Sequence, residues 1–94
     1  MLDFEFRGGA YVASCSRFQS GQLAEVFIDA VGATSKGVTP LHEDAKDAAV
    51  CLSIALQYGA PVEVIRKAVT RTSEGEPTGI VGCVLDLLED QDHD

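Results

Sequence analysis

The chain has 94 residues, 46% of them hydrophobic and 23% charged, which is the composition of an ordinary globular protein. This length allows one hydrophobic core, so we expect a single domain over 1–94. Fifteen acidic residues against seven basic ones give a net charge of −8. Such a surface repels a phosphate backbone, and we expect no nucleic-acid partner.

Nothing in the sequence predicts a membrane segment or a metal site. No apolar run approaches the roughly 20 residues that cross a bilayer, and Met1 to Glu5 lack the basic and apolar regions of a signal peptide. We therefore expect a cytoplasmic protein without a membrane partner. Cys15, Cys51 and Cys83 lie far apart and form no Cys-x-x-Cys pair. We expect buried, reduced thiols, no metal and no cofactor.

The first thirty residues predict three strands joined by short turns. Asp3–Arg7 alternates polar and apolar side chains, which is the period of a half-buried strand. Gly8-Gly9 predicts a tight turn, Ala10–Phe18 a second strand and Gln19–Gln22 a second turn. Leu23–Ala30 predicts a third strand because it is rich in Val, Phe and Ile. This order is typical of an antiparallel meander.

Residues 31–40 predict a loop, since two glycines and a proline stand among small polar residues. A long helix is expected from His42 to Tyr58, with Thr39 as its N-cap and Pro40 at the first helical position. Gly59 follows this helix and is expected to end it, because glycine accepts the left-handed conformation of a C-terminal cap.

Two further helices are expected, from Val62 to Val69 and from about Thr78 to Glu89. On the first of these, Glu63, Arg66 and Lys67 are predicted to face water. Residues 89–94 are expected to form a flexible acidic tail. The sequence therefore predicts an α+β fold, with a three-stranded antiparallel sheet followed by three helices packed on one face.

The helix over 42–58 is apolar around more than one face. Its main stripe holds Leu41, Ala45, Ala48, Leu52, Ala55 and Leu56. Val50, Cys51 and Ile54 lie elsewhere around the helix. Because a large exposed apolar patch is uncommon on a soluble monomer, we predict a homodimer, or a complex in which a partner protein covers this second face. The alternative is that the last helix covers it within one chain.

The loop after the third strand is the best candidate for contact with an anion. Gly32, Ser35, Lys36 and Gly37 precede a helix, where backbone N–H groups and a lysine can bind an anion, and His42 lies at the helix start. The Walker spacing is absent, because Lys36 precedes the second glycine. A flexible connector is the alternative interpretation.

The sequence predicts no catalytic residues. Ser14-Cys15-Ser16 contains possible nucleophiles, but a nucleophile needs a base within hydrogen-bond reach. The chain has two histidines, and neither is placed near Cys15 by the sequence. An enzyme with an unrecognised site remains the weakest of the alternatives.

Several stretches of the chain resemble the TSCPD domain family. Glu25-Val26-Phe27 matches an E-x-F/I strand, Ser53 to Gly59 matches an S-x-A-L-x-x-G helix end, and Pro61 to Ile65 matches a P-x-E-x-I helix. The resemblance covers about half to two-thirds of the chain. These residues mostly determine the fold, so the resemblance indicates shape more than activity.

The TSCPD module occurs at the C-terminal end of cobalamin-dependent ribonucleotide reductases and in small stand-alone proteins. The resemblance implies a non-catalytic accessory or protein-interaction domain linked to nucleotide metabolism, with a reductase large subunit as a candidate partner. The reductase-linked domains often carry cysteines after the strand, whereas 35–39 here has none. A thiol or zinc function is therefore not carried over. The alternative function is a small anionic-ligand binder that uses the loop over 32–37.

Overall fold

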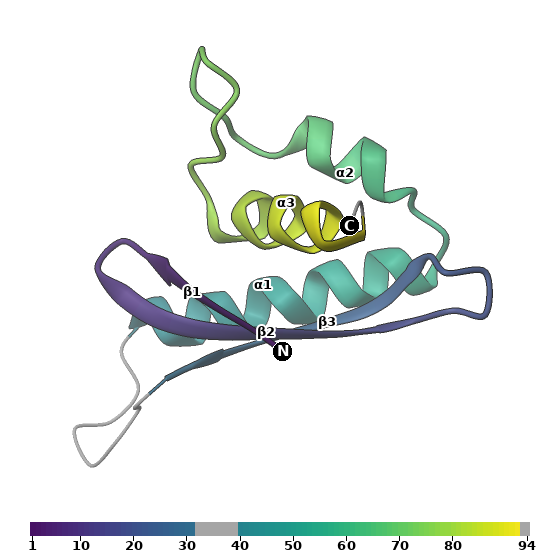
Figure 1. Cartoon of the computed structure of the whole chain (residues 1–94), viewed down its shortest axis with the longest axis horizontal. Helices are drawn as coiled ribbons and strands as arrows, with labels where there is room; N and C mark the ends of the chain where they lie inside the picture. The colour runs from purple at the N-terminus through teal and green to yellow at the C-terminus, as the bar shows by residue number, and fades with distance from the viewer. Residues whose placement is uncertain (32–39, 93–94) are drawn as a thin grey trace.

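The computed structural model describes residues 1–31 and 40–92. The elements in chain order are β1 (Leu2–Phe6), β2 (Gly9–Arg17), β3 (Leu23–Ala30), α1 (Pro40–Gln57), α2 (Val62–Ala68) and α3 (Ile80–Asp92). A three-stranded sheet is followed by three helices, and Figure 1 shows how these elements are arranged. The predicted α+β fold is confirmed, including the antiparallel order β1-β2-β3.

The turn between β1 and β2 lies one residue earlier than predicted. Arg7 and Gly8 both have positive φ, 49° and 79°, as the two central residues of a type I′ turn require. Phe6 pairs with Gly9, so Gly9 opens β2 instead of completing the turn. A Cβ atom at Gly9 would lie 3.1 Å from Cε2 of Tyr11, and this close contact explains a glycine inside the strand.

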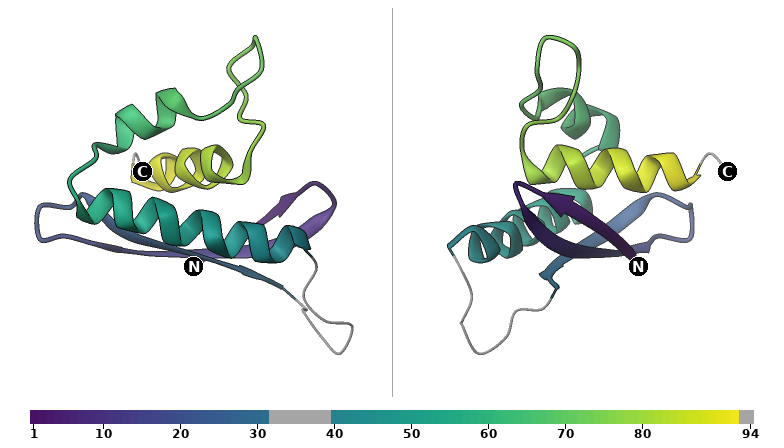
Figure 2. Two further views of the ribbon diagram at one scale, coloured as in Figure 1. Left: turned by 180° about the vertical axis from the view of Figure 1, so that it is seen from behind. Right: turned by 60° about the vertical axis from the view of Figure 1, so that its left-hand side comes forward.

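The sheet buries one face and leaves the other uncovered. Tyr11, Ala13, Val26 and Ile28 point to the buried face, as the two-residue period of a strand predicts. Figure 2 shows the helices on this side of the sheet, with α2 farthest from it. α1 packs along β3, and α2 packs on α3. The core therefore lies between the sheet and the α1 and α3 helices.

Helix α1 begins at Pro40 and ends at the predicted glycine. Gly59 has a φ of 95°, and its N–H donates to the carbonyl of Leu56 at 3.1 Å. The N–H of Ala60 donates to the carbonyl of Ala55 at 3.0 Å. This pair of bonds is the Schellman motif, which satisfies carbonyls at the end of the helix.

Two predictions about the C-terminal half need correction. Helix α3 extends to Asp92, so the segment predicted as a tail is helical between Glu89 and Asp92, and 93–94 lie outside the described residues. Arg66 does not simply face water. Its guanidinium is 3.0 Å from Asp86 on α3, because α2 packs against α3 through the side that carries Arg66.

Candidate functional site

The predicted anion-contact residues are divided by the limits of the described structure. Gly32, Ser35, Lys36 and Gly37 lie outside the described residues, so their role stays a prediction. His42 is half-buried in the first turn of α1. Its ring meets the ring of Tyr11 edge to face, with centroids 5.6 Å apart. His42 therefore packs against the core, where an aromatic contact of this geometry is favourable.

The outer face of α1 remains exposed. Val50 and Ile54 are 55% and 52% exposed, and Tyr58, one turn further along the chain, is 88% exposed. The alternative in which α3 covers Val50 and Ile54 is therefore wrong for the single chain. Ala49 is buried, although Ala48 was predicted for the inner stripe. The inner face is rotated because α1 lies along the edge strand β3.

A groove of about 400 Å³ separates this exposed face from β3. Phe27 on β3 and Val50 and Ile54 on α1 are the large apolar side chains that line it, and each is about half exposed. The small residues Ala49 and Ser53 also line the groove. We call it the α1–β3 groove. It offers an apolar surface with space for side chains from another molecule.

Ser53 joins α1 to the backbone of the edge strand. Its Oγ accepts a hydrogen bond from the N–H of Val26 at 2.9 Å and donates one to the carbonyl of Val26 at 3.0 Å. One hydroxyl can do both, because it carries a donor and two acceptor lone pairs. Ser53 thus occupies backbone groups that a further strand would otherwise pair with.

Carboxylates surround the groove. Glu25 and Asp29 line it from β3. Among the residues that the structure describes, the only cation on its lining is Lys46, whose Nζ lies 3.6 Å from Oδ1 of Asp29. Glu43 and Asp47 are exposed on α1, at helical spacing in line with Ile54. The charge around the groove is therefore negative.

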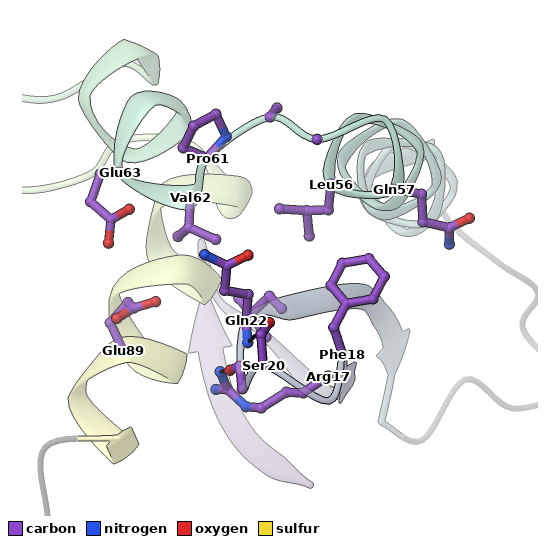
Figure 3. A pocket seen from close by; sticks show the side chains of 14 residues that line it. Arg17, Phe18, Ser20, Gln22, Leu56, Gln57, Pro61, Val62, Glu63 and Glu89 are labelled. Carbon is purple, nitrogen blue, oxygen red and sulfur yellow. Dashed lines mark hydrogen bonds between the residues drawn. The ribbon is translucent and has the colours of Figure 1, made fainter.

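A second hollow of about 450 Å³ lies where α1 turns into α2. Figure 3 shows Gln22, Leu56 and Val62 pointing into it, with Glu63 and Glu89 together on one side. We call it the α1–α2 cleft. Gln57 lines both the cleft and the groove, so the two hollows adjoin.

The cleft does not have the charge of an anion site. Glu63 and Glu89 would repel an anion, and Arg17 donates from Nη1 to the carbonyl of Gly21 at 2.9 Å. An apolar group or a cation matches this lining better than an anion does. The predicted anion contact therefore gains no support from the cleft.

Asp86 on α3 holds two arginines. It accepts hydrogen bonds from Nη1 and Nη2 of Arg71, both at 2.9 Å, and from Nε of Arg66 at 3.1 Å. The hydrogen bonds from Arg71 lower the pKa of Asp86 most, and those from Arg66 lower it further. Burial raises the pKa and opposes both. Arg71 also donates to the carbonyl of Gly75 at 3.0 Å. The cluster ties α2 and the following loop to α3, which is a structural role.

The surroundings of Cys83 do not activate its thiol. Burial raises the pKa of the Cys83 thiol, and Asp86 adds to this shift, so Cys83 is a poor nucleophile. Within 1–31 and 40–92, no group of three His, Cys, Asp or Glu side chains is placed to hold a metal ion. Over the same residues, no helix has both the length and the apolar character to span a bilayer.

Comparison of the chain with protein-family models, with curated proteins and with solved structures found no match.

Proposed function

We propose that this chain is a small non-catalytic interaction domain of the TSCPD type, which works by docking another protein chain on the α1–β3 groove. The observation that carries the proposal is the exposure of Val50 and Ile54 beside Phe27. Three large apolar side chains around one groove mark an interaction surface, whereas single exposed apolar residues are ordinary.

The shape of α1 supports this proposal. Val50, Ile54 and Tyr58 follow one another at four-residue spacing, so they form a continuous exposed stripe along the helix. The inner face of the same helix is already satisfied by the core residues Ala49 and Leu52. A second chain that covers the stripe would remove from water apolar surface that nothing in the described chain covers.

The TSCPD resemblance adds the biological setting of the proposal. It implies a cytoplasmic accessory domain linked to nucleotide metabolism, with either a second copy of the chain or a reductase large subunit as the partner. The alternative function, a small anionic-ligand binder, rests on Gly32, Ser35, Lys36, Gly37 and His42. No contact among the described residues favours that alternative.

The test measures whether the groove engages a protein chain. Sedimentation velocity is run on the chain alone over increasing concentration, and then with a cobalamin-dependent reductase large subunit added. Ile54→Ser is the test variant. Val64→Ser is its matched control, because Val64 is 60% exposed on α2 and does not line the groove. Circular dichroism checks that both variants fold.

We expect a complex, either with a second copy or with the large subunit, that Ile54→Ser weakens at least about tenfold and Val64→Ser leaves unchanged. The proposal fails under two joint conditions. In the first, the chain stays monomeric at the highest concentration. In the second, neither the large subunit nor a helical peptide shows binding that depends on Ile54.

A further inference from the structure

We infer that the occupant of the α1–β3 groove is a basic amphipathic helix of another protein. This inference rests on the proposed function and names the chemistry of the partner. It follows from three features of the groove, which are the bonded backbone of Val26 at the strand edge, the apolar walls and the acidic surroundings.

The bonded backbone of Val26 at the strand edge favours a helix over an added strand. A peptide that extends the sheet must pair with the outward backbone groups of β3. At Val26 those groups are already bonded to Ser53 at 2.9 and 3.0 Å. Strand addition would have to break both bonds, whereas a helix docks through its side chains and leaves them intact.

The dimensions of the groove suit a few turns of helix. Its lining on α1 runs from Lys46 to Gln57, about three turns or 16 Å of helix axis. The apolar walls are Phe27, Val50 and Ile54, and the small residues between them leave space for inserted side chains. A partner helix with apolar residues at i, i+4 and i+7 presents a stripe of matching length.

The charge around the groove selects a basic partner over a second copy. Among the described residues, Glu25, Asp29, Glu43 and Asp47 lie in or beside the groove, against one cation, Lys46. A two-fold contact would place the same carboxylates against each other, and each chain carries a net charge of −8. Lysine or arginine flanking the apolar stripe of a partner meets these carboxylates favourably.

The adjoining cleft extends the same pattern. Glu63 and Glu89 stand on one side of the α1–α2 cleft, next to the apolar side chains of Leu56 and Val62. A helix that leaves the groove at Gln57 reaches this cleft directly. Carboxylates therefore border both hollows, although polar side chains such as Gln22 and Arg17 also line the cleft.

The experiment uses three fluorescently labelled 18-residue peptides in anisotropy titrations with the full chain. The first is helical, with leucines along one face and lysines on the other. The second replaces every lysine by glutamate, and the third has the composition of the first in an order that breaks the leucine stripe. Ile54→Ser and Asp47→Asn are the test variants of the protein, with Val64→Ser as the control.

We expect the lysine peptide to bind at least about tenfold more tightly than either other peptide. Ile54→Ser should weaken it about tenfold or more, and Val64→Ser should leave it unchanged. Asp47→Asn should weaken binding less and reduce its dependence on salt, since Asp47 lies on the rim.

Several results overturn the inference. If the glutamate peptide or the peptide with the broken leucine stripe binds as tightly as the lysine peptide, the occupant is not a basic amphipathic helix. The same follows if the Ile54→Ser and Val64→Ser proteins bind the lysine peptide with equal affinity. Self-association that Ile54→Ser abolishes and Asp47→Asn strengthens makes a second copy the occupant, which leaves the proposed function standing. A monomer that binds none of the peptides and no large subunit overturns both.

Discussion

Helices α1 and α3 lie on the same side of the sheet, yet their large apolar side chains differ in burial. On α3, Val84 and Leu85 are completely buried and Asp86 pairs with two arginines from neighbouring elements. On α1, Val50 and Ile54 are more than half exposed. The difference arises because α3 is covered from outside by α2 and the following loop. Among the described residues, α1 packs mainly against β3, with further contacts to α3 and to Tyr11 on β2, and its outer face stays exposed.

Burial separates the apolar residues of α3, which stabilise the fold, from the exposed apolar residues of α1, which contribute little to it. Leu85 stabilises the domain, because it leaves water only when the chain folds. Ile54 gains little from folding, because half of its surface stays in water. Its apolar surface is free to meet another chain, which is the surface that the proposed docking function uses.

The largest expected effect contrasts these two residues directly. Leu85→Ala should lower the free energy of unfolding by about 2–5 kcal/mol, because it opens a cavity in a closed core. Ile54→Ala should change it by less than about 0.5 kcal/mol, since the side chain is largely exposed. Urea denaturation followed by circular dichroism measures both, and similar losses for the two variants would contradict the comparison.

The next prediction concerns how tightly the segment from Val69 to Pro77 packs on α3. A Cβ atom at Gly82 would lie 2.9 Å from Cβ of Pro77 and 3.0 Å from Cγ2 of Val69. Gly82→Ala should therefore destabilise the domain by about 1–3 kcal/mol, although alanine favours a helix.

Gly79→Ala is the matched control, because its Cβ would meet nothing within 4 Å. We expect its thermal midpoint to stay within a few degrees of the wild-type value, since no atom has to move. A Gly82→Ala variant as stable as this control would show that α3 is not tightly covered by the segment from Val69 to Pro77.

The smallest effect of the three is the contribution of Asp86. Asp86→Asn should cost about 1–2 kcal/mol at neutral pH, because the carboxylate bonds to two guanidiniums while remaining partly exposed. The pKa of Asp86 is lowered in the folded state from an ordinary value of 3.8. Its contribution to stability is therefore present above that ordinary value and is lost as the pH falls through the folded pKa.

Urea denaturation of the wild type and Asp86→Asn at several pH values tests this dependence. The difference between the two proteins should be constant at neutral pH and shrink below about pH 4, as the carboxyl in the wild type becomes protonated. A difference that persists undiminished into acid would mean that the charge of Asp86 is not what stabilises the cluster.

Much of the fold follows from local sequence patterns. The content of Val, Phe and Ile in Leu23–Ala30 predicted β3 with its observed bounds, and Pro40 and Gly59 marked the two ends of α1 as predicted. These signals are readable because each depends on a few neighbouring residues and on the φ values that they allow. The Gly8-Gly9 turn was misplaced by one residue, because either glycine can occupy the left-handed position while Tyr11 decides between them.

The candidate site was less predictable, because it depends on contacts between distant elements. The surplus of apolar residues on α1 was visible in the sequence, but the decision between burial by α3 and exposure needed the packing of both helices. Ser53 was recognisable only as a lone polar residue in an apolar stretch, and its bond to Val26 required the position of β3. The pairing of Arg66 with Asp86 likewise depends on how α2 meets α3.

The place of α3 along the chain has a consequence for biosynthesis. The three strands are complete at Ala30, but the residues that cover their apolar face include Val84, Leu85 and Leu88. A small sheet without its covering layer is marginal in water. Until α3 has been made, α1 is the only described helix of the core available to cover that face, so part of the apolar surface of the nascent sheet remains exposed. The domain closes only when Leu88 has left the exit tunnel, so its folding follows most of its own translation.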